Sequence, residues 1–308
     1  MMKKQIGYVG LGKMGMSMVL RLKDAKWDVR AYDIIQEARN TAKRKKVAIA
    51  KDLRDLVGQL PTPRIIWLMV PSRAEKGEKN PVDQILQEIM PYLSKGDIVI
   101  DGGNSLYEET ARRAEYLARS GVEFMDTGVS GGPGTVREGK PAIMVGGNKK
   151  VFEKLRFLFY DLTQKESIGY MGPAGSGHFV KMIHNGIEYG YMQALAEGFT
   201  LLKRAPFELD LQEVARVYSN GSVIESRLTK WLQSGLKKYG EELEEVSGSV
   251  GHTGEGEWTV KTGKKFHIPL PVIKAALLFR AQSAKHPSYT GKILSMLRSE
   301  FGGHKVSN

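Results

Sequence analysis

The sequence contains no cysteine in 308 residues. A disulfide framework and a thiolate metal site are therefore both excluded, and a reducing, intracellular location is expected. The sequence also lacks any segment of about 18 consecutive apolar residues, the length that a membrane-spanning helix needs. The opening residues, MMKKQIGYVGLGKMG, carry two lysines but too short an apolar run for a signal peptide. We therefore expect a cytoplasmic protein that does not enter a membrane.

Acidic residues are in the minority, with 34 against 46 basic residues and a net charge of +12. Such an excess suits either nucleic acid or a small polyanionic substrate. The densest basic run, KRKK at residues 43–46, follows an expected helix, and no aromatic residues interleave with it to stack on bases. We therefore favour a positive field that attracts phosphorylated substrates, and do not expect a nucleic-acid partner.

The order of β-rich and helical patterns predicts two domains. After two β-rich runs near the N-terminus, further runs follow at residues 64–70, 97–103, 123–129, 142–147 and 167–171. Helical patterns separate several of them, which is typical of a doubly wound, mostly parallel sheet. Beyond residue 172 the pattern is almost entirely helical. We predict an α/β Rossmann-type domain over residues 1–172 and an all-α domain over residues 173–308.

A glycine motif, GLGKMG at residues 10–15, follows the first β-rich run and opens a helical pattern. In such a motif Gly10 permits a tight turn, Gly12 lets the backbone approach a pyrophosphate, and Gly15 allows close packing of helix and strand. An acidic residue, Asp33, ends the next β-rich run about 20 residues further on, where it can bind a ribose hydroxyl. The motif and the acid together predict a dinucleotide site.

Asp33 also predicts which dinucleotide is bound. A carboxylate at this position accepts hydrogen bonds from the ribose 2′-hydroxyl and repels a 2′-phosphate. The next residue is Ile34, where an arginine would otherwise favour that phosphate. The sequence therefore predicts NAD in preference to NADP.

A helical segment, GHFVKMIHNGIEYGYMQALAEGF at residues 177–199, places polar residues where an amphipathic helix usually has its apolar stripe. Lys181, His184, Asn185 and Glu188 are spaced i, i+3, i+4 and i+7, and the surrounding residues are mostly apolar. The helix is expected to be buried, and a buried lysine and glutamate need partners or a ligand. An internal Lys–Glu network is one explanation. Because a histidine and an amide share the stripe, an active-site face is the favoured explanation.

The residue types on this stripe suit acid–base chemistry. Lys181 lies near the positive end of its helix and among apolar residues, and both effects favour a neutral, basic amine. Glu188, two turns further on, is available as an acid, while His184 and Asn185 can bind hydroxyl oxygens. The six histidines show no metal-ligand spacing, so a metal-independent reaction is expected.

Four motifs resemble those of the β-hydroxyacid dehydrogenases: GLGKMG, DGGNS, DTGVSGG, and GxxGxGxxxKxxxN from Gly172 to Asn185. The segment GHFVKMIHNGIEYG is more specific and resembles the decarboxylating 6-phosphogluconate dehydrogenases. His184, Glu188 and Tyr189 distinguish it from relatives such as 3-hydroxyisobutyrate dehydrogenase. The fold implied by this resemblance, a Rossmann-type domain followed by an all-helical domain, agrees with the patterns above.

The resemblance implies a reaction of the pentose phosphate pathway type, in which 6-phosphogluconate becomes ribulose 5-phosphate and CO2. Lys181 would remove the proton of the 3-hydroxyl as hydride leaves C3, and would then, protonated, polarise the 3-keto group during decarboxylation. Glu188 would protonate C1 of the enediol.

The resemblance also implies the binding residues. Those for the substrate are Asn104, Ser130, Gly131, Gly132, His184, Asn185, Tyr189, Arg280, Arg298 and His304. Those for the cofactor are Gly10, Leu11, Gly12, Lys13, Met14, Gly15, Asp33, Val70 and Asn104. Composition alone would place Arg280 on a helix surface. In the family, the tail carrying Arg298 and His304 completes the neighbouring subunit's site, which implies a homodimer or homotetramer.

Two departures from the family pattern stand out. Longer members carry a duplicated helical segment that this chain lacks, so it resembles the short form. Where those members have KGTGKW, this chain has Thr253-Gly-Glu255-Gly-Glu257-Trp258, in which acids replace a cationic contact. Two alternatives stay open at this point: a dehydrogenase of a smaller β-hydroxy acid such as 3-hydroxyisobutyrate, and a non-catalytic, basic dinucleotide-binding protein.

Overall fold

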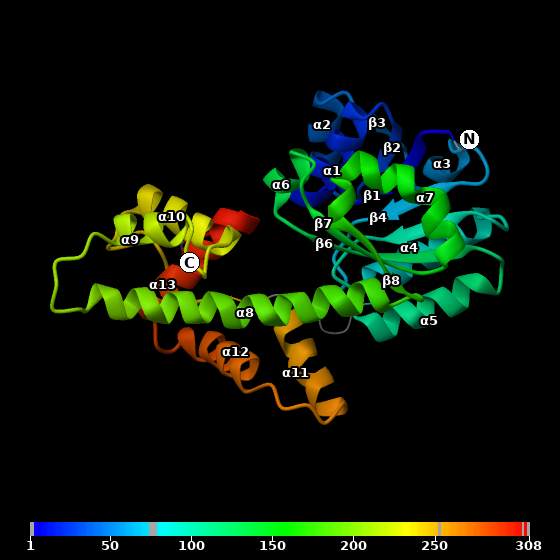
Figure 1. The fold of residues 1–308 in the computed structure, drawn as a ribbon. Coiled ribbons are helices and arrows are strands. Elements are labelled where there is room, and N and C mark those ends of the chain that lie inside the picture. Colours follow the sequence, from blue (N-terminus) through cyan, green and yellow to red (C-terminus); the bar gives the residue numbers. More distant parts are fainter. Residues whose placement is uncertain (1–2, 74–78, 252–253, 304, 307–308) are drawn as a thin grey trace. The chain divides into compact units, whose positions relative to one another are not determined.

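The computed structural model describes residues 3–73, 79–251, 254–303 and 305–306. The chain divides into two compact units, Met1–Lys181 and Met182–Asn308. The division falls within α8 (Ser176–Lys203), a single long helix (Figure 1). The first turns of α8 therefore belong to the N-terminal unit, although the last strand, β8, ends at Gly172.

The N-terminal unit is built on one sheet, as the alternating pattern predicts. The strands in the described residues are β1 (Gln5–Val9), β2 (Asp28–Tyr32), β3 (Ala48–Ile49), β4 (Ile65–Leu68), β5 (Ile98–Asp101), β6 (Glu123–Ser130), β7 (Ala142–Gly146) and β8 (Ile168–Gly172). Their order is β3-β2-β1-β4-β5-β6-β7-β8, and every neighbouring pair is parallel except β6 with β7. The predicted mostly parallel α/β fold is confirmed.

Helices cover both faces of this sheet. They are α1 (Lys13–Asp24), α2 (Gln36–Arg44), α3 (Leu53–Gly58), α4 (Pro81–Ile89), α5 (Tyr107–Ala118), α6 (Pro133–Arg137) and α7 (Lys149–Leu162), with short 3-10 turns at Met90–Tyr92 and Lys165–Ser167. Successive side chains of a strand point to opposite faces. In β4, Trp67 packs into the cluster of α1 and α7, while Ile66 and Leu68 pack with α3 and α4. Because both faces are covered, all four residues of β4 are apolar and buried.

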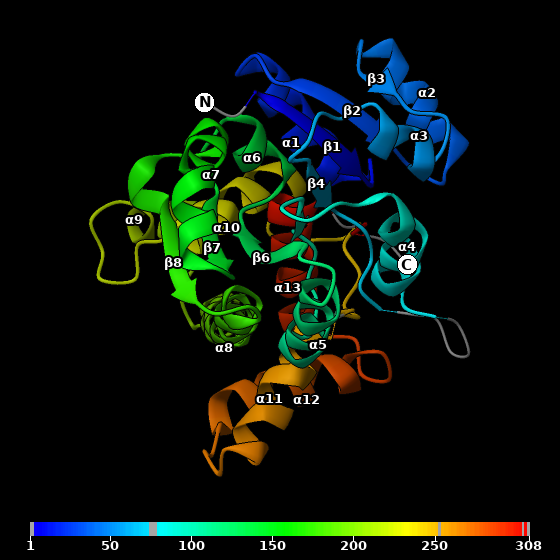
Figure 2. The same cartoon turned by 90° about the vertical axis from the view of Figure 1, so that its right-hand side faces the viewer.

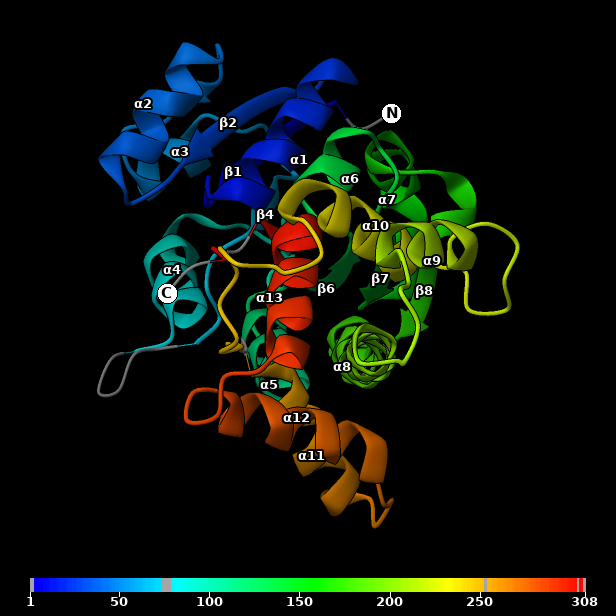
Figure 3. The ribbon, with the colours of Figure 1, turned by 90° about the vertical axis from the view of Figure 1, so that its left-hand side faces the viewer.

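The C-terminal unit is helical throughout its described residues, which confirms the prediction for this region. It comprises the rest of α8 with α9 (Leu211–Tyr218), α10 (Arg227–Tyr239), α11 (Glu255–Lys265), α12 (Pro271–Ser283) and α13 (Tyr289–Gly302). Helices α10 and α13 lie side by side, and Leu232, Leu236 and Leu294 lie in their shared core (Figures 1 and 3). Figure 2 looks along α8. No helix among the described residues is both long and apolar enough to cross a membrane.

Candidate active site

The turn after β1 has the geometry of a dinucleotide-binding loop. Gly10 has a φ of 99°, and a Cβ atom there would lie 2.2 Å from the carbonyl oxygen of Met69. A Cβ atom on Gly15 would lie 2.0 Å from the carbonyl oxygen of Gly10, so this helix start also requires glycine. By contrast, a Cβ atom on Gly12 would meet no atom within 4 Å. Open space therefore lies beside the N-terminus of α1.

This open helix end suits a dinucleotide phosphate. Gly12 is the N-cap of α1, no side chain caps the helix, and its first turn carries no acidic residue. Lys13 and Met14 are the first residues of α1, and a helix N-terminus of this kind suits an anionic ligand. Val70 Cγ1 lies 3.0 Å from the Cβ position of Gly10, so this predicted cofactor residue borders the same turn.

Asp33, the predicted ribose ligand, lies directly after β2 and is buried. Its Oδ2 accepts a 2.6 Å hydrogen bond from the amide of Leu11, and its Oδ1 accepts one of 2.8 Å from Ile35. The carboxylate thus joins the glycine turn to the end of β2. Sequence reasoning missed Arg39 of α2, whose Nη1 donates to the carbonyl oxygens of Asp33 and Ile34.

Asn104 lies in a turn that a buried carboxylate organises. Asp101, the last residue of β5, accepts a 3.1 Å hydrogen bond from the Gly103 amide and one of 2.6 Å from Ser105 Oγ. Arg113 Nη1 lies 3.8 Å from the same carboxylate. This arrangement fixes the backbone on both sides of Asn104. The sequence drew attention to Asn104 but not to Asp101.

Ser130, Gly131 and Gly132 follow the adjacent strand. Ser130 ends β6, Gly131 has a φ of 126°, and Gly132 is the N-cap of α6. Strands β1, β4, β5 and β6 are parallel neighbours in the sheet. The segments that follow them, including Asn104 and Ser130, therefore share the carboxyl edge with the Gly10 turn, the edge where such sheets bind ligands.

Lys181 belongs to the N-terminal unit and lies against β6. Its side chain is 8% exposed, and a Cβ atom built on Gly128 would be 2.4 Å from Lys181 Cβ. The lysine therefore does not face bulk solvent. The expectation that the helix is buried all round is wrong, because Ile187 is 60% exposed.

The rest of the polar stripe is connected by short contacts. His184 Nδ1 lies 3.1 Å from Asn185 Oδ1 and 3.7 Å from Glu188 Oε2. The Glu188 side chain is 22% exposed, so it is partly shielded from water. Lys181 and Glu188 are seven residues apart on one helix, which is about 10 Å along its axis.

A second cluster forms around Tyr189 in the C-terminal unit. The Arg280 guanidinium of α12 lies 3.7 Å from the centroid of the Tyr189 ring, and a Cβ atom on Gly256 would be 2.6 Å from the same ring. Arg280 is only 2% exposed, so its placement on a helix surface was wrong. Burial lowers the pKa of Arg280 to about 10.

Two further charged residues belong to this cluster. Burial also lowers the pKa of Arg298 in α13, and the positive charge of Arg298 adds to the lowering of the Arg280 pKa. Glu255, the first residue of α11, is buried, and its negative charge acts on both arginines in the opposite direction. The cluster thus combines two cations with one buried acid, a role for Glu255 that the sequence did not reveal.

The tail is described only in part, and His304 lies outside the described residues. Within the C-terminal unit, the amide of Ser247 donates a 2.6 Å hydrogen bond to the carbonyl oxygen of Val306. Completion of a neighbour's site by this tail therefore stays a prediction.

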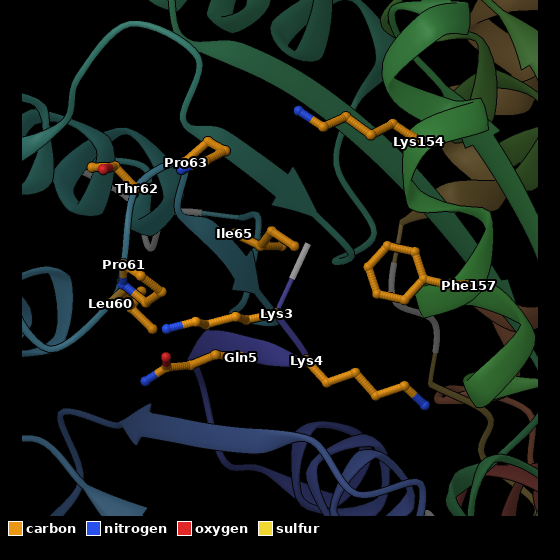
Figure 4. A pocket seen from close by; sticks show the side chains of 10 residues that line it. All are labelled: Lys3, Lys4, Gln5, Leu60, Pro61, Thr62, Pro63, Ile65, Lys154 and Phe157. Carbon is orange, nitrogen blue, oxygen red and sulfur yellow. The ribbon is translucent and has the colours of Figure 1, made fainter. Parts of the chain in front are cut away.

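A cavity of about 990 Å³ lies elsewhere, at the amino-terminal edge of the sheet (Figure 4). Lys3, Ile65, Lys154 and Phe157 are among its lining residues, and no predicted site residue is one of them. A third lysine, Lys4, forms a 2.7 Å ion pair with Asp161 and points away in Figure 4. The cavity begins where β1 and β4 begin, so it is separate from the carboxyl edge.

Comparison with protein families identifies two matching models. The NAD binding domain of 6-phosphogluconate dehydrogenase matches residues 5–172, and the C-terminal domain of 6-phosphogluconate dehydrogenase matches residues 177–297. Together the two models account for most of both compact units.

Individual relatives agree with these models. The Bacillus subtilis protein YqeC, provisionally named a 6-phosphogluconate dehydrogenase, is 40% identical over 300 residues, which cover 97% of this chain and 98% of YqeC. The NAD(+)-dependent, decarboxylating 6-phosphogluconate dehydrogenase of Haloferax volcanii is 38% identical over 304 residues, covering 98% of each chain.

Solved structures of other proteins share the fold of this chain. Plasmodium falciparum 6-phosphogluconate dehydrogenase superposes with a TM-score of 0.77 at 27% identity, covering 96% of this chain and 70% of that chain. The 3-hydroxyisobutyrate dehydrogenase of Mycobacterium tuberculosis superposes with a TM-score of 0.75 at 20% identity, covering 96% and 100%. At that identity the second match shows a shared fold only.

Proposed function

This chain belongs to the 6-phosphogluconate dehydrogenase family, and we propose that it converts 6-phosphogluconate to ribulose 5-phosphate and CO2 with reduction of NAD. The observation that carries the proposal is the pair of Lys181 and Glu188 on one face of α8, with the Tyr189–Arg280 stack beginning at the next residue. A base, an acid and an anion-binding arginine are the groups that this reaction needs.

Lys181 acts as the base in this proposal. Its burial against Gly128 disfavours the ammonium form and makes a neutral amine accessible. The amine takes the proton of the 3-hydroxyl as C3 is oxidised. The ammonium that results then donates to the 3-keto oxygen and draws electrons from the breaking bond to the carboxylate, so that CO2 leaves. Because this lysine polarises the carbonyl, a metal ion is not needed, and we expect activity to survive a chelator.

Glu188 acts as the acid in the last step. The carboxyl group donates a proton to C1 of the enediol that decarboxylation leaves. His184, 3.7 Å from Glu188, and Asn185 offer polar groups for the sugar hydroxyls between base and acid. The base, the two hydroxyl-binding groups and the acid therefore lie along one face of α8.

The phosphate is assigned to the cluster around Tyr189. Arg280 supplies a guanidinium group from the same chain, and a guanidinium is the side chain best suited to bind phosphate oxygens. A buried arginine that contacts an aromatic face and whose Nε has no hydrogen-bond partner among the described residues retains capacity for an anion. An unphosphorylated β-hydroxy acid would leave this capacity unused, which favours the phosphorylated substrate over 3-hydroxyisobutyrate.

NAD is assigned to the turn of residues 10–15. When bound, it accepts the hydride from C3 of the substrate. The open N-terminus of α1 would hold its pyrophosphate, and Asp33 would hold the ribose hydroxyls. The preference for NAD over NADP rests on the carboxylate of Asp33, which repels a 2′-phosphate.

A homodimer or homotetramer is part of the proposal. The tail residues Arg298 and His304 would contribute to phosphate binding in the neighbouring subunit. Deleting residues 298–308 should then raise KM for the phosphosugar far more than KM for NAD. Equal effects on the two KM values would count against a phosphate role for the tail, and sedimentation of the intact chain as a monomer would count against the oligomer.

One assay tests the proposed function. Formation of NADH and CO2 is measured with 6-phosphogluconate, gluconate and 3-hydroxyisobutyrate under the same conditions. The proposal predicts equal amounts of NADH and CO2 with 6-phosphogluconate, and far lower kcat/KM with the other two acids. Preferential oxidation of 3-hydroxyisobutyrate would reject this proposal in favour of a dehydrogenase of a smaller β-hydroxy acid.

A further inference from the structure

The first turn of α8 is held by a buried carboxylate from β6. Asp126 is completely buried, and its Oδ1 accepts a 2.7 Å hydrogen bond from the amide of Gly175. Its Oδ2 accepts a second hydrogen bond, also 2.7 Å, from the amide of His178. Amide groups at a helix start have no partner within the helix, so this carboxylate serves as a cap supplied by a distant strand.

Two glycines make room for this carboxylate. A Cβ atom on Gly146 of β7 would lie 2.3 Å from Asp126 Oδ1, and one on Gly177 would lie 2.9 Å from Oδ2. The His178 ring adds a third anchor, because its Nδ1 lies 2.8 Å from Thr110 Oγ1 of α5. The start of α8 is therefore fixed by β6, β7 and α5 together, within the N-terminal unit.

The same face of β6 determines where the Lys181 side chain lies. Side chains two residues apart on a strand share a face, so Asp126 and Gly128 both face α8. Lys181 lies one turn beyond His178, and its Cβ and Cγ would be 2.4 Å and 3.0 Å from a Cβ atom on Gly128. The carboxylate of Asp126 thus fixes the position and rotation of the helix, and the bare backbone of Gly128 receives the stem of the lysine.

We propose that Asp126, together with Gly128, is a positioning residue for the amine of Lys181. This inference rests on the proposed function, because it assumes that Lys181 is the base of the oxidation step. A rotation of α8 about its axis, or a shift along it, would carry the amine away from the 3-hydroxyl, while the dinucleotide turn after β1 would stay unchanged. The positioning role therefore predicts a loss in hydride transfer without a loss in cofactor binding.

The contacts also revise the expected electrostatics. The helix start was expected to present a positive end to Lys181, but the Asp126 carboxylate accepts hydrogen bonds from the amides of Gly175 and His178 and offsets that charge. The neutral form of the amine is therefore attributed to burial, and the role of Asp126 is attributed to geometry.

The test compares Asp126→Asn with a matched control, Asp52→Asn. Asp52 caps α3 in the same unit by accepting a 2.7 Å hydrogen bond from the Asp55 amide, but α3 carries no proposed site residue. Asp52→Asn keeps an oxygen that can accept from the Asp55 amide, whereas Asp126→Asn loses one of its two accepting oxygens. Asp126→Asn should therefore melt earlier than the parent, and Asp52→Asn should melt close to it. The rate of NADH formation is measured in single turnover at saturating NAD and 6-phosphogluconate, together with the Kd of NAD.

Asp126→Asn should slow the single-turnover rate by about 100-fold, the loss that a displacement of about 1 Å can cause, with the Kd of NAD within about twofold of the parent. Asp52→Asn should leave both values within about twofold. An Asp126→Asn rate within twofold of the parent, or an equal loss in Asp52→Asn, would overturn the inference. If Asp126→Asn does not fold, Gly128→Ala tests the positioning role instead. Gly128→Ala should slow the single-turnover rate by about tenfold, and a rate equal to that of the parent would overturn the inference.

Lys181→Met, assayed in parallel, separates this inference from the proposed function. If Lys181→Met retains the parental rate, the proposed base is wrong and the positioning role falls with it. If Lys181→Met is inactive while Asp126→Asn is not impaired, only the positioning role is wrong.

Discussion

The two units of this protein build their candidate sites in different ways. In the N-terminal unit, site residues lie in turns fixed by backbone geometry, as at Gly10 with its φ of 99° and at the Asp101 turn. In the C-terminal unit, the cluster consists of side chains from separate helices, with Tyr189 on α8 and Arg280 on α12. Backbone turns leave a motif in the sequence, whereas side chains that meet by helix packing do not.

The largest effect is expected at Lys181, where the two units share one helix. Lys181→Met keeps the length and apolarity of the stem but removes the base, so hydride transfer should fall by about 10³-fold or more. Single-turnover NADH formation measures the loss. Lys203→Met, at the other end of the same helix, where Lys203 pairs with Glu242, is the control and should keep the parental rate. Equal single-turnover rates in Lys181→Met and Lys203→Met would show that Lys181 is not the base.

Arg280 tests the charge-based site of the C-terminal unit. Arg280→Met should raise KM for 6-phosphogluconate by about 100-fold, because a buried cation opposite the phosphate is lost. KM for NAD should stay within about twofold. Arg216→Met, which removes an exposed arginine paired with Glu213, is the matched control. A rise in KM that is equally large with gluconate would show that Arg280 supports the fold and does not bind phosphate.

Asp33 tests the motif-based site of the N-terminal unit. The double substitution Asp33→Asn with Ile34→Arg should shift the NAD/NADP ratio of kcat/KM toward NADP by about tenfold or more, since a repelling carboxylate is replaced by a cation. Adding Arg39→Met should reduce the gain if Arg39, which lies beside this turn, helps to bind the 2′-phosphate. An unchanged ratio in the double variant would reject Asp33 as the discriminating residue.

The smallest effect is expected at Glu255. Its negative charge opposes the lowering of the Arg280 and Arg298 pKa values, so it competes with a bound phosphate for the same cations. Glu255→Gln should lower KM for 6-phosphogluconate by about threefold, or roughly 0.7 kcal/mol of binding free energy. Glu257→Gln, two residues further on, is the control. A higher KM in Glu255→Gln would mean that this acid holds the arginines in place.

The sequence predicted the fold well because its signals are local. Alternating β-rich and helical patterns identified the sheet, but β3 was missed, since Ala48 and Ile49 are too few to show a period. Within the helical region, no motif marked helix α11. Its glycines favour a turn locally, yet Gly256 is required because the Tyr189 ring lies 2.6 Å from its Cβ position.

The site was predicted only where the residues carry a motif. The GLGKMG turn and the polar stripe of α8 could be read directly. Asp126 and Glu255 could not, because each acts through partners distant in the sequence or through burial. Arg39 could not, because its hydrogen bonds to the carbonyl oxygens of Asp33 and Ile34 leave no sequence motif. Arg280 was assigned a phosphate contact by resemblance alone, and its local pattern misplaced it on the surface.

The central claim is that the base and the acid on α8 serve separate steps. The most direct test is a rapid-quench experiment on Glu188→Gln with saturating NAD and 6-phosphogluconate, following NADH, CO2 and ribulose 5-phosphate. The account predicts about one NADH and one CO2 per site at the parental rate, with ribulose 5-phosphate appearing about 100-fold more slowly. Parallel slowing of all three products, or parental release of the sugar, would contradict it.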